Sequence, residues 1–280
     1  MNGIYRIDLG SPTLLEFRGP DAVRFLNGQV TQDVRRVVSA GISLPSCVTD
    51  AKGRLQFRVS LTENGGGLWV CGFAEWAEAL EARLTRYLIA DDVEVVDLTG
   101  KYALVHFTGP LADAPAGVVA RQSTRFGIAG TDWWIPISAS VEFPVGIKLL
   151  DSDGLEALRI GNGVPVWGRE LKEGMLPPEA RLDETDISYQ KGCYIGQEVI
   201  SRIKSAGKVN KRLTHLVFDA GVPLASGQLV NAAGSSIGEL TSISPRVEAA
   251  GRHALGYVKR GETEVFAMEP DGIQHAAQVV

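Results

Sequence analysis

The chain has 280 residues, 45% of them hydrophobic, and a net charge of -5 from 28 basic and 33 acidic residues. This length is sufficient to bury a substantial core and suits two or three domains. No long run of one charge sign occurs, which argues against a nonspecific nucleic-acid or membrane surface. The chain has no apolar stretch of about 18 residues and no apolar segment like that of a signal peptide at its start. We therefore expect a protein that is neither secreted nor membrane-spanning.

The cysteines and histidines are scattered along the chain. The three cysteines are odd in number and lack both zinc-site spacing and a disulfide framework: Cys47, Cys71 and Cys193. None of the four histidines has a second ligand at metal-binding spacing: His106, His215, His253 and His275. This pattern predicts a reducing, cytoplasmic location and no metal site.

The first half of the chain alternates strand and helix patterns. The pattern predicts strands at 14–19, 46–50, 54–61, 68–71, 93–98, 102–107 and 133–137, with helices after Pro20 and across 76–88. In the second helix, Trp76, Leu80, Leu84 and Leu88 recur every four residues. In the last strand we expect one of the adjacent tryptophans, Trp133 and Trp134, to point inward and the other outward. The mixture indicates an α+β fold.

The second half begins with one helix and ends in short strands. An N-cap cluster at 151–153 predicts a helix over 155–160, and an irregular connection follows. Short strands are then expected at 213–218, 228–231, 236–243, 254–258 and 276–280. Strands of this length and spacing are typical of a small barrel or sandwich.

The chemically richest stretch is the octet Lys191–Glu198, with the sequence KGCYIGQE. It combines an ammonium, a thiol, a phenol, an amide and a carboxylate with two glycines. A helix is expected to begin near Gly196, which would place Cys193 close to a helix N-terminus and to Lys191, a setting that favours the thiolate. Lys191 could attract an anionic ligand or act as a nucleophilic amine. The alternatives for Cys193 are an inert buried thiol and a nucleophile paired with a distant histidine.

Other polar residues around the octet suit a folate-like ligand. Gln197 and Glu198 offer the donors and acceptors that a flat heterocycle such as a pterin needs. Arg202, Lys211 and Arg212 could meet a carboxylate tail.

The octet resembles the signature of the YgfZ-type folate-binding proteins. That family includes a bacterial iron-sulfur maintenance factor and mitochondrial assembly factors, and it is related to the aminomethyltransferase of the glycine cleavage system. Similar patterns occur at 15–22, 25–26, 29–34, 50–54, 159–163, 177–179, 210–212 and 255–258, so the resemblance covers nearly the whole chain.

The resemblance implies a three-domain ring with a C-terminal small β-barrel. Its expected parts are a discontinuous folate-binding domain (1–45 plus 148–210), an α+β, ferredoxin-like domain (46–147) and the barrel (211–280). The implied function is to bind tetrahydrofolate, or another folate, and to support assembly or repair of iron-sulfur enzymes. Its expected partners are iron-sulfur client or assembly proteins, without direct nucleic-acid or membrane contact.

The same resemblance assigns roles to the octet and its surroundings. Lys191 and Cys193 are the expected catalytic pair. The expected cofactor-binding residues are Gly192, Tyr194, Gly196, Gln197, Glu198, Arg202, Lys211 and Arg212.

A folate-dependent aminomethyltransferase or demethylase that acts on a methylamine-type donor is the alternative, which leaves open whether the protein is an enzyme. Aminomethyltransferases carry an acidic pair in the strand after the position of Gly53, whereas residues 54–62 contain no Asp or Glu. Their pterin-holding Glu is also absent from 126–134, and they normally lack a cysteine at the position of Cys193. Asp50 and Asp132 remain as possible substitutes.

Overall fold

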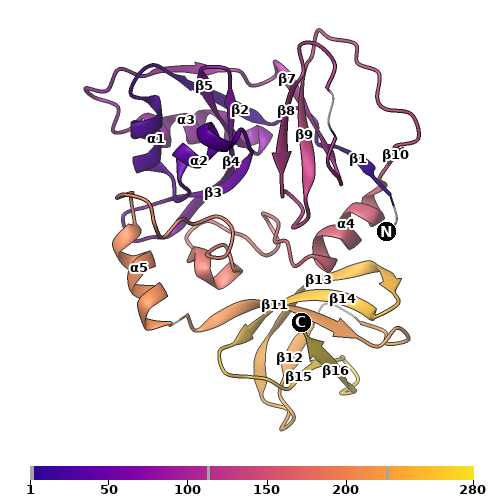
Figure 1. Cartoon of the computed structure of the whole chain (residues 1–280). Helices are drawn as coiled ribbons and strands as arrows, with labels where there is room; N and C mark the ends of the chain where they lie inside the picture. Colours follow the sequence, from indigo (N-terminus) through magenta and orange to yellow (C-terminus); the bar gives the residue numbers. More distant parts are fainter. Residues whose placement is uncertain (1–2, 112–113, 208, 225–226) are drawn as a thin grey trace. The chain divides into compact units, whose positions relative to one another are not determined.

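The computed structural model describes residues 3–111, 114–207, 209–224 and 227–280. Its contacts divide the chain into two compact units, of which the first comprises Met1–Leu150 and Asp183–Ser201. The second comprises Asp151–Leu182 and Arg202–Val280. These boundaries differ from those of the three expected domains, whose limits and ring arrangement stay predictions. The mixed α+β class is confirmed (Figure 1).

The first sheet of the first unit is antiparallel, and the strands expected at 46–50 and 54–61 pair in it as a hairpin. Its strand order is β3 (Leu44–Thr49), β4 (Leu55–Asn64), β5 (Gly67–Gly72), β2 (Thr13–Arg18) and β6 (Glu94–Asp97). Helices α1 (Ala22–Gln29), α2 (Val34–Ala40) and α3 (Ala77–Thr85) contribute to the core on one face of this sheet. Alternation along β4 directs Val59 and Leu61 into that core and leaves Arg58 and Ser60 for the opposite face.

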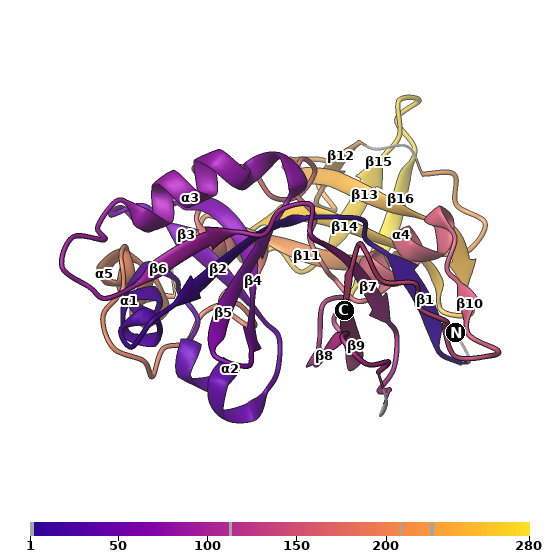
Figure 2. The same ribbon diagram turned by 90° about the horizontal axis from the view of Figure 1, so that it is seen from above.

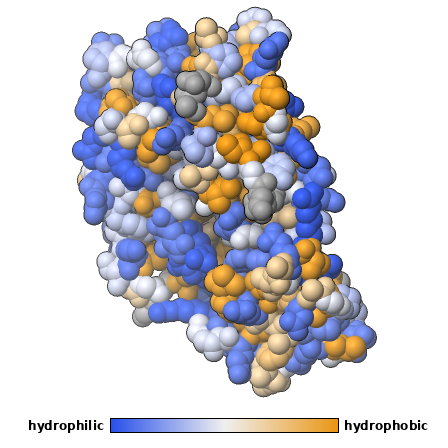
Figure 3. All heavy atoms as spheres, turned by 45° about the vertical axis from the view of Figure 1, so that its right-hand side comes forward, coloured by the Kyte–Doolittle hydropathy of each residue, from blue (hydrophilic) through white to orange (hydrophobic). Residues whose placement is uncertain are grey.

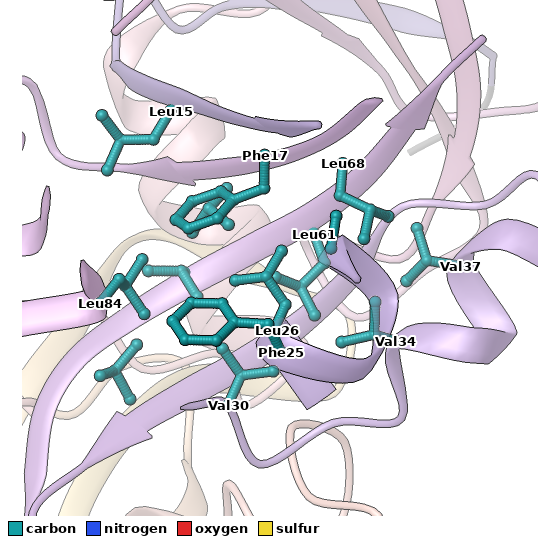
Figure 4. Packing of buried hydrophobic residues seen from close by; sticks show 14 of the residues in the cluster. Leu15, Phe17, Phe25, Leu26, Val30, Val34, Val37, Leu61, Leu68 and Leu84 are labelled. Carbon is teal, nitrogen blue, oxygen red and sulfur yellow. The ribbon is translucent and has the colours of Figure 1, made fainter. Parts of the chain in front are cut away.

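The packing of this core follows the helical and strand periodicities (Figure 4). Phe17 of β2 stacks near Phe25 of α1, with ring centroids 6.3 Å apart. Leu80 and Leu84 of α3 are fully buried, as their spacing predicts. The expected helix was too long, because Ala74–Trp76 forms a 3-10 turn and Leu88 bonds back to the carbonyl of Thr85 in a tighter turn.

The second sheet has the order β10 (Lys148–Leu149), β1 (Tyr5–Asp8), β7 (Tyr102–Phe107), β9 (Gly130–Pro136) and β8 (Val119–Ser123). The chain passes from β1 directly to β2, so its first two strands belong to different sheets (Figure 2). Trp69 of the first sheet and Trp134 of the second meet edge to face at 5.6 Å, which joins the two sheets in one apolar cluster.

The expectation of one outward-facing tryptophan in β9 was wrong. Trp133 and Trp134 are 1% and 0% exposed. Trp134 packs toward the first sheet, and Trp133 packs on the other side against Phe107, at 4.8 Å between ring centroids. Partly buried residues such as Phe143 cover that side, so both faces of β9 are shielded from solvent.

The second unit contains helix α4, the end of helix α5 and the expected C-terminal barrel. Helix α4 (Ser152–Gly161) begins at Asp151, whose carboxylate accepts a hydrogen bond from Gly154 N at 2.7 Å. A 3-10 helix, η2 (Pro177–Ala180), follows in the irregular connection. The closed barrel has the order β11 (Lys211–Phe218), β14 (Gly251–Lys259), β13 (Ser236–Glu248), β12 (Gln228–Val230), β15 (Val265–Met268) and β16 (Gln274–Val279). The sequence pattern had not indicated β15.

Hydrophilic and hydrophobic residues are interspersed over the face shown in Figure 3. Within the part of the chain that the structure describes, no helix has the length and apolar character needed to cross a membrane.

Candidate functional site

The segment that carries the octet lies in the first unit and is tied to two distant stretches of chain. Ser188 N donates to the carbonyl of Thr31 at 3.0 Å, and Ile195 N donates to that of Gly28 at 3.2 Å. From β3, the hydroxyl of Thr49 donates to the carbonyl of Ile195 at 2.6 Å. The octet is therefore held on both sides by hydrogen bonds to residues more than 140 positions away in the sequence.

Lys191 is buried, with 6% exposure, and its ammonium faces the backbone. Nζ donates to the carbonyl oxygens of Asn27, Val30 and Gln32 at 2.6, 2.7 and 2.8 Å. Burial lowers the pKa of Lys191 to about 7, against the opposing effect of Asp33. The carbonyls also oppose this shift, because only the ammonium can donate to all three at once. All three N–H donors of Lys191 are thus used inside the protein.

Cys193 is exposed, whereas Cys47 and Cys71 are buried. Burial raises the pKa of the Cys47 thiol well above its ordinary value and also raises that of Cys71. Helix α5 (Gln197–Ala206) begins shortly after Cys193, as expected. Lys191 and Cys193 do not share one environment, because the ammonium is buried and the thiol faces solvent.

Tyr194 is buried and packs against Ile187 and Ile200 in a small apolar cluster. Its ring lies 5.1 Å from Lys191 Nζ, within the range of a cation-π contact. Burial is the main reason that the pKa of Tyr194 is raised, and Tyr189 adds to it. The hydroxyl of Tyr194 is buried and has no hydrogen-bond partner among the described residues.

The two glycines of the octet differ in whether the structure has room for a side chain at their positions. Gly196 adopts a φ of 88°, and a Cβ there would lie 2.5 Å from the carbonyl oxygen of Asp50 and 2.8 Å from Gly53 Cα. Only glycine fits this close approach of the 50–53 turn. Gly192 is exposed, and a Cβ at this position would meet no atom within 4 Å.

The remaining predicted ligand residues fall in both units. Gln197 is half-buried and Glu198 exposed in the first turn of α5, while Arg202 is exposed further along this helix. Lys211 and Arg212 begin strand β11 of the second unit, which also includes Arg202. Their grouping with the octet around one ligand stays a prediction.

Two buried ion pairs were not anticipated from the sequence. Arg58 Nε donates to Asp186 at 2.7 Å, and Arg125 Nη2 donates to Asp132 at 2.8 Å. Asp132 also contacts His106 Nδ1 at 2.7 Å. Both carboxylates are fully buried, whereas the arginine side chains are 20% and 21% exposed.

Arg125 Nη2 also donates to the hydroxyl of Ser60 on β4 at 3.2 Å, which ties this ion pair to the polar face of the first sheet. Burial alone would raise the pKa of Asp132, but Arg125 and His106 outweigh it and lower the pKa to about 2. Alternation in β4 was the available signal for Arg58, since it places that residue opposite the apolar face. Its partner Asp186 lies 128 positions away, beyond the reach of local patterns.

The chemistry available at the octet centres on the thiol of Cys193. An exposed thiolate is a nucleophile and a soft metal ligand. The described residues contain no group of three or more His, Cys, Asp or Glu side chains arranged to hold a metal ion. A single cysteine supplies only one of the ligands that an iron-sulfur cluster needs, so Cys193 by itself cannot hold one.

No family model matches the chain. The tRNA-modifying protein YgfZ of Serratia proteamaculans is 29% identical over 246 residues, which cover 79% of this chain and 73% of that protein. An iron-sulfur cluster assembly factor IBA57 homologue of Mycosarcoma maydis is 27% identical over 75% of this chain, and the match spans only 56% of that protein.

The solved structure of aminomethyltransferase T of the glycine cleavage system from Bartonella henselae matches 99% of this chain and 84% of its own, with a TM-score of 0.80 at 19% identity. This match shows the fold. The resemblance inferred from the octet is confirmed: over most of its length the chain is similar to YgfZ and IBA57 proteins, and it has the aminomethyltransferase T fold.

Proposed function

We propose that the protein binds a folate, in the first place tetrahydrofolate, and supports the assembly or repair of iron-sulfur enzymes. The observation that carries this proposal is an exposed thiol, Cys193, on a loop held by hydrogen bonds on both sides. The names of the relatives support the coarser statement of an iron-sulfur or tRNA-modifying role.

Cys193 would act as a transient ligand or redox-active thiol toward a client protein. Its exposure allows a partner to approach, and its single sulfur leaves the other cluster ligands to that partner. The buried thiols of Cys47 and Cys71 are inaccessible for this role.

The polar residues near the octet suit a folate. The amide of Gln197 and the carboxylate of Glu198 match the donors and acceptors of a pterin edge. Arg202 and Arg212 would hold the carboxylate tail. Tetrahydrofolate, when bound, would supply a carrier for one-carbon units.

The role of the thiol is tested by complementation of a cell that lacks the protein. We expect Cys193→Ser to fold normally but to leave iron-sulfur enzyme activity unrestored. The control is Ser205→Ala, on the exposed end of α5, which should restore that activity fully. Full restoration by Cys193→Ser would remove the thiol from the mechanism.

Folate binding is tested separately by calorimetric titration of the purified protein with tetrahydrofolate. We expect Glu198→Gln and Arg212→Met each to weaken binding by about tenfold or more, since each removes a charge-assisted contact. Glu78→Gln, at an exposed position of helix α3, is the matched control and should bind normally. Absence of a binding signal for the unmodified protein would refute the folate part of the proposal.

The aminomethyltransferase alternative has the shared fold in its favour. Two observations weaken it: β4 carries no carboxylate up to Thr62, and Asp132 is engaged by Arg125 and His106. Turnover of a methylamine-type donor with tetrahydrofolate would favour this alternative over a non-enzymatic role.

A further inference from the structure

The ammonium of Lys191 completes the C-terminal end of helix α1. The last carbonyls of a helix have no partner within the helix, and α1 has no basic residue in its last turn. Asn27 O accepts from Lys191 Nζ, and Gly28 O accepts from Ile195 N. The octet thus supplies, from a distant part of the chain, both the cation and the donor that this helix end lacks.

The connection between α1 and α2 bends around the same nitrogen. Val30 O and Gln32 O lie 2.7 and 2.8 Å from Lys191 Nζ, so three carbonyls converge on a single buried cation. The tetrahedral ammonium can direct one N–H at each carbonyl, whereas a planar guanidinium points its donors outward in a fork. A neutral, apolar side chain would leave the carbonyls buried without donors.

We propose that Lys191 is a positioning residue whose ammonium acts as a tethered cation, fixing the octet on the α1–α2 connection and thereby setting the backbone position of Cys193. This role differs from a direct contact between Lys191 and a ligand, because that contact would require the ammonium to leave its three carbonyls. The inference does not depend on folate binding or on any client protein.

The test is hydrogen exchange by mass spectrometry on the full chain. Lys191→Ala should speed exchange about tenfold or more in peptides that contain Ser188 and Ile195, with barrel peptides unchanged. Added n-propylammonium, which replaces the deleted atoms, should restore protection. Tetramethylammonium, a cation without N–H donors, should not.

Thr49→Val is the matched control, because it breaks a tie to Ile195 without touching the cation. It should also loosen the octet, but n-propylammonium should not restore its protection. If n-propylammonium fails to restore protection from hydrogen exchange in Lys191→Ala, the proposal is contradicted.

A functional readout separates positioning from chemistry. If the proposal holds, n-propylammonium should return the rate of Cys193 alkylation by iodoacetamide in Lys191→Ala to that of the unmodified protein. If instead Lys191→Met keeps full protection at the octet and normal alkylation of Cys193 yet fails in complementation, the amine acts on a ligand or client and the inference is wrong. Neither exchange nor alkylation uses folate, so their outcome is independent of the titration above.

Discussion

Asp132 shows how a single buried charge depends on its partners. Its carboxylate is fully buried and is stabilised by Arg125 and His106. Removing one partner of a buried ion pair leaves an uncompensated charge, which costs about 3–5 kcal/mol. Arg125→Met should therefore destabilise the first unit strongly.

Acid should weaken the fold through Asp132. Its pKa is about 2 in the folded protein and 3.8 ordinarily, so the unfolded chain binds more protons between these values. The stability that Asp132 contributes is present above about pH 4 and is lost as the pH falls toward about 2. Urea unfolding between pH 6 and pH 2.5 measures this loss. Asp132→Asn should show a smaller pH dependence, and an unchanged dependence would assign the acid effect to other groups.

The three thiols should differ in reactivity according to their exposure. Iodoacetamide should label Cys193 in the native protein, while the buried Cys47 and Cys71 should react only after unfolding. Peptide mass spectrometry reads the sites, and the urea-unfolded chain, in which all three react, is the control. Labelling of Cys47 in the native protein would show that the structure around β3 opens readily.

At the scale of elements, the contact between the octet and the β3–β4 hairpin rests on Gly196. Gly196→Ala should destabilise the protein by about 2 kcal/mol or more, because of its φ of 88° and the 2.5 Å approach to Asp50 O. Gly192→Ala, with open space around it, should be nearly neutral. Thermal unfolding of the two variants compares them directly. Equal melting temperatures would mean that the hairpin moves to accommodate the methyl group at low cost.

At the scale of the whole molecule, the two units have separate cores and different titrating groups. In the second unit, His215 Nε2 and His253 Nδ1 are 2.7 Å apart on neighbouring barrel strands. Burial, with His253 and Arg181, lowers the pKa of His215 to about 4, whereas Glu248 opposes the shift. The second unit should therefore respond to milder acid than Asp132 does in the first.

The unfolded chain binds more protons at His215 between about pH 6.5 and pH 4, so stability should fall as the pH is lowered through this range. We expect a loss of about 1–2 kcal/mol for this buried group, measured by urea unfolding at pH 7 and pH 5. His215→Gln should lose less on acidification. An equal loss in the variant would mean that His215 does not control this range.

Much of the fold was predictable because local periodicity reports which face of an element is buried. The repeat at Leu80 and Leu84, the alternation along β4 and the short C-terminal strands all indicated their elements. Periodicity does not report whether the second face of a strand is also covered, which is why the burial of both Trp133 and Trp134 was missed.

By itself the sequence determined the α+β composition, the run of short C-terminal strands and the octet with its reactive groups, since each depends on residues close together in the chain. Only the tertiary structure decided what the octet's residues contact. The acceptors of Lys191 are backbone carbonyls about 160 positions away. Every residue has a backbone carbonyl, so the sequence does not indicate which ones accept from Lys191. The pairing of Arg58 with Asp186 likewise depends on which distant segments pack together in the fold. The spacing of residues along the sequence does not specify this.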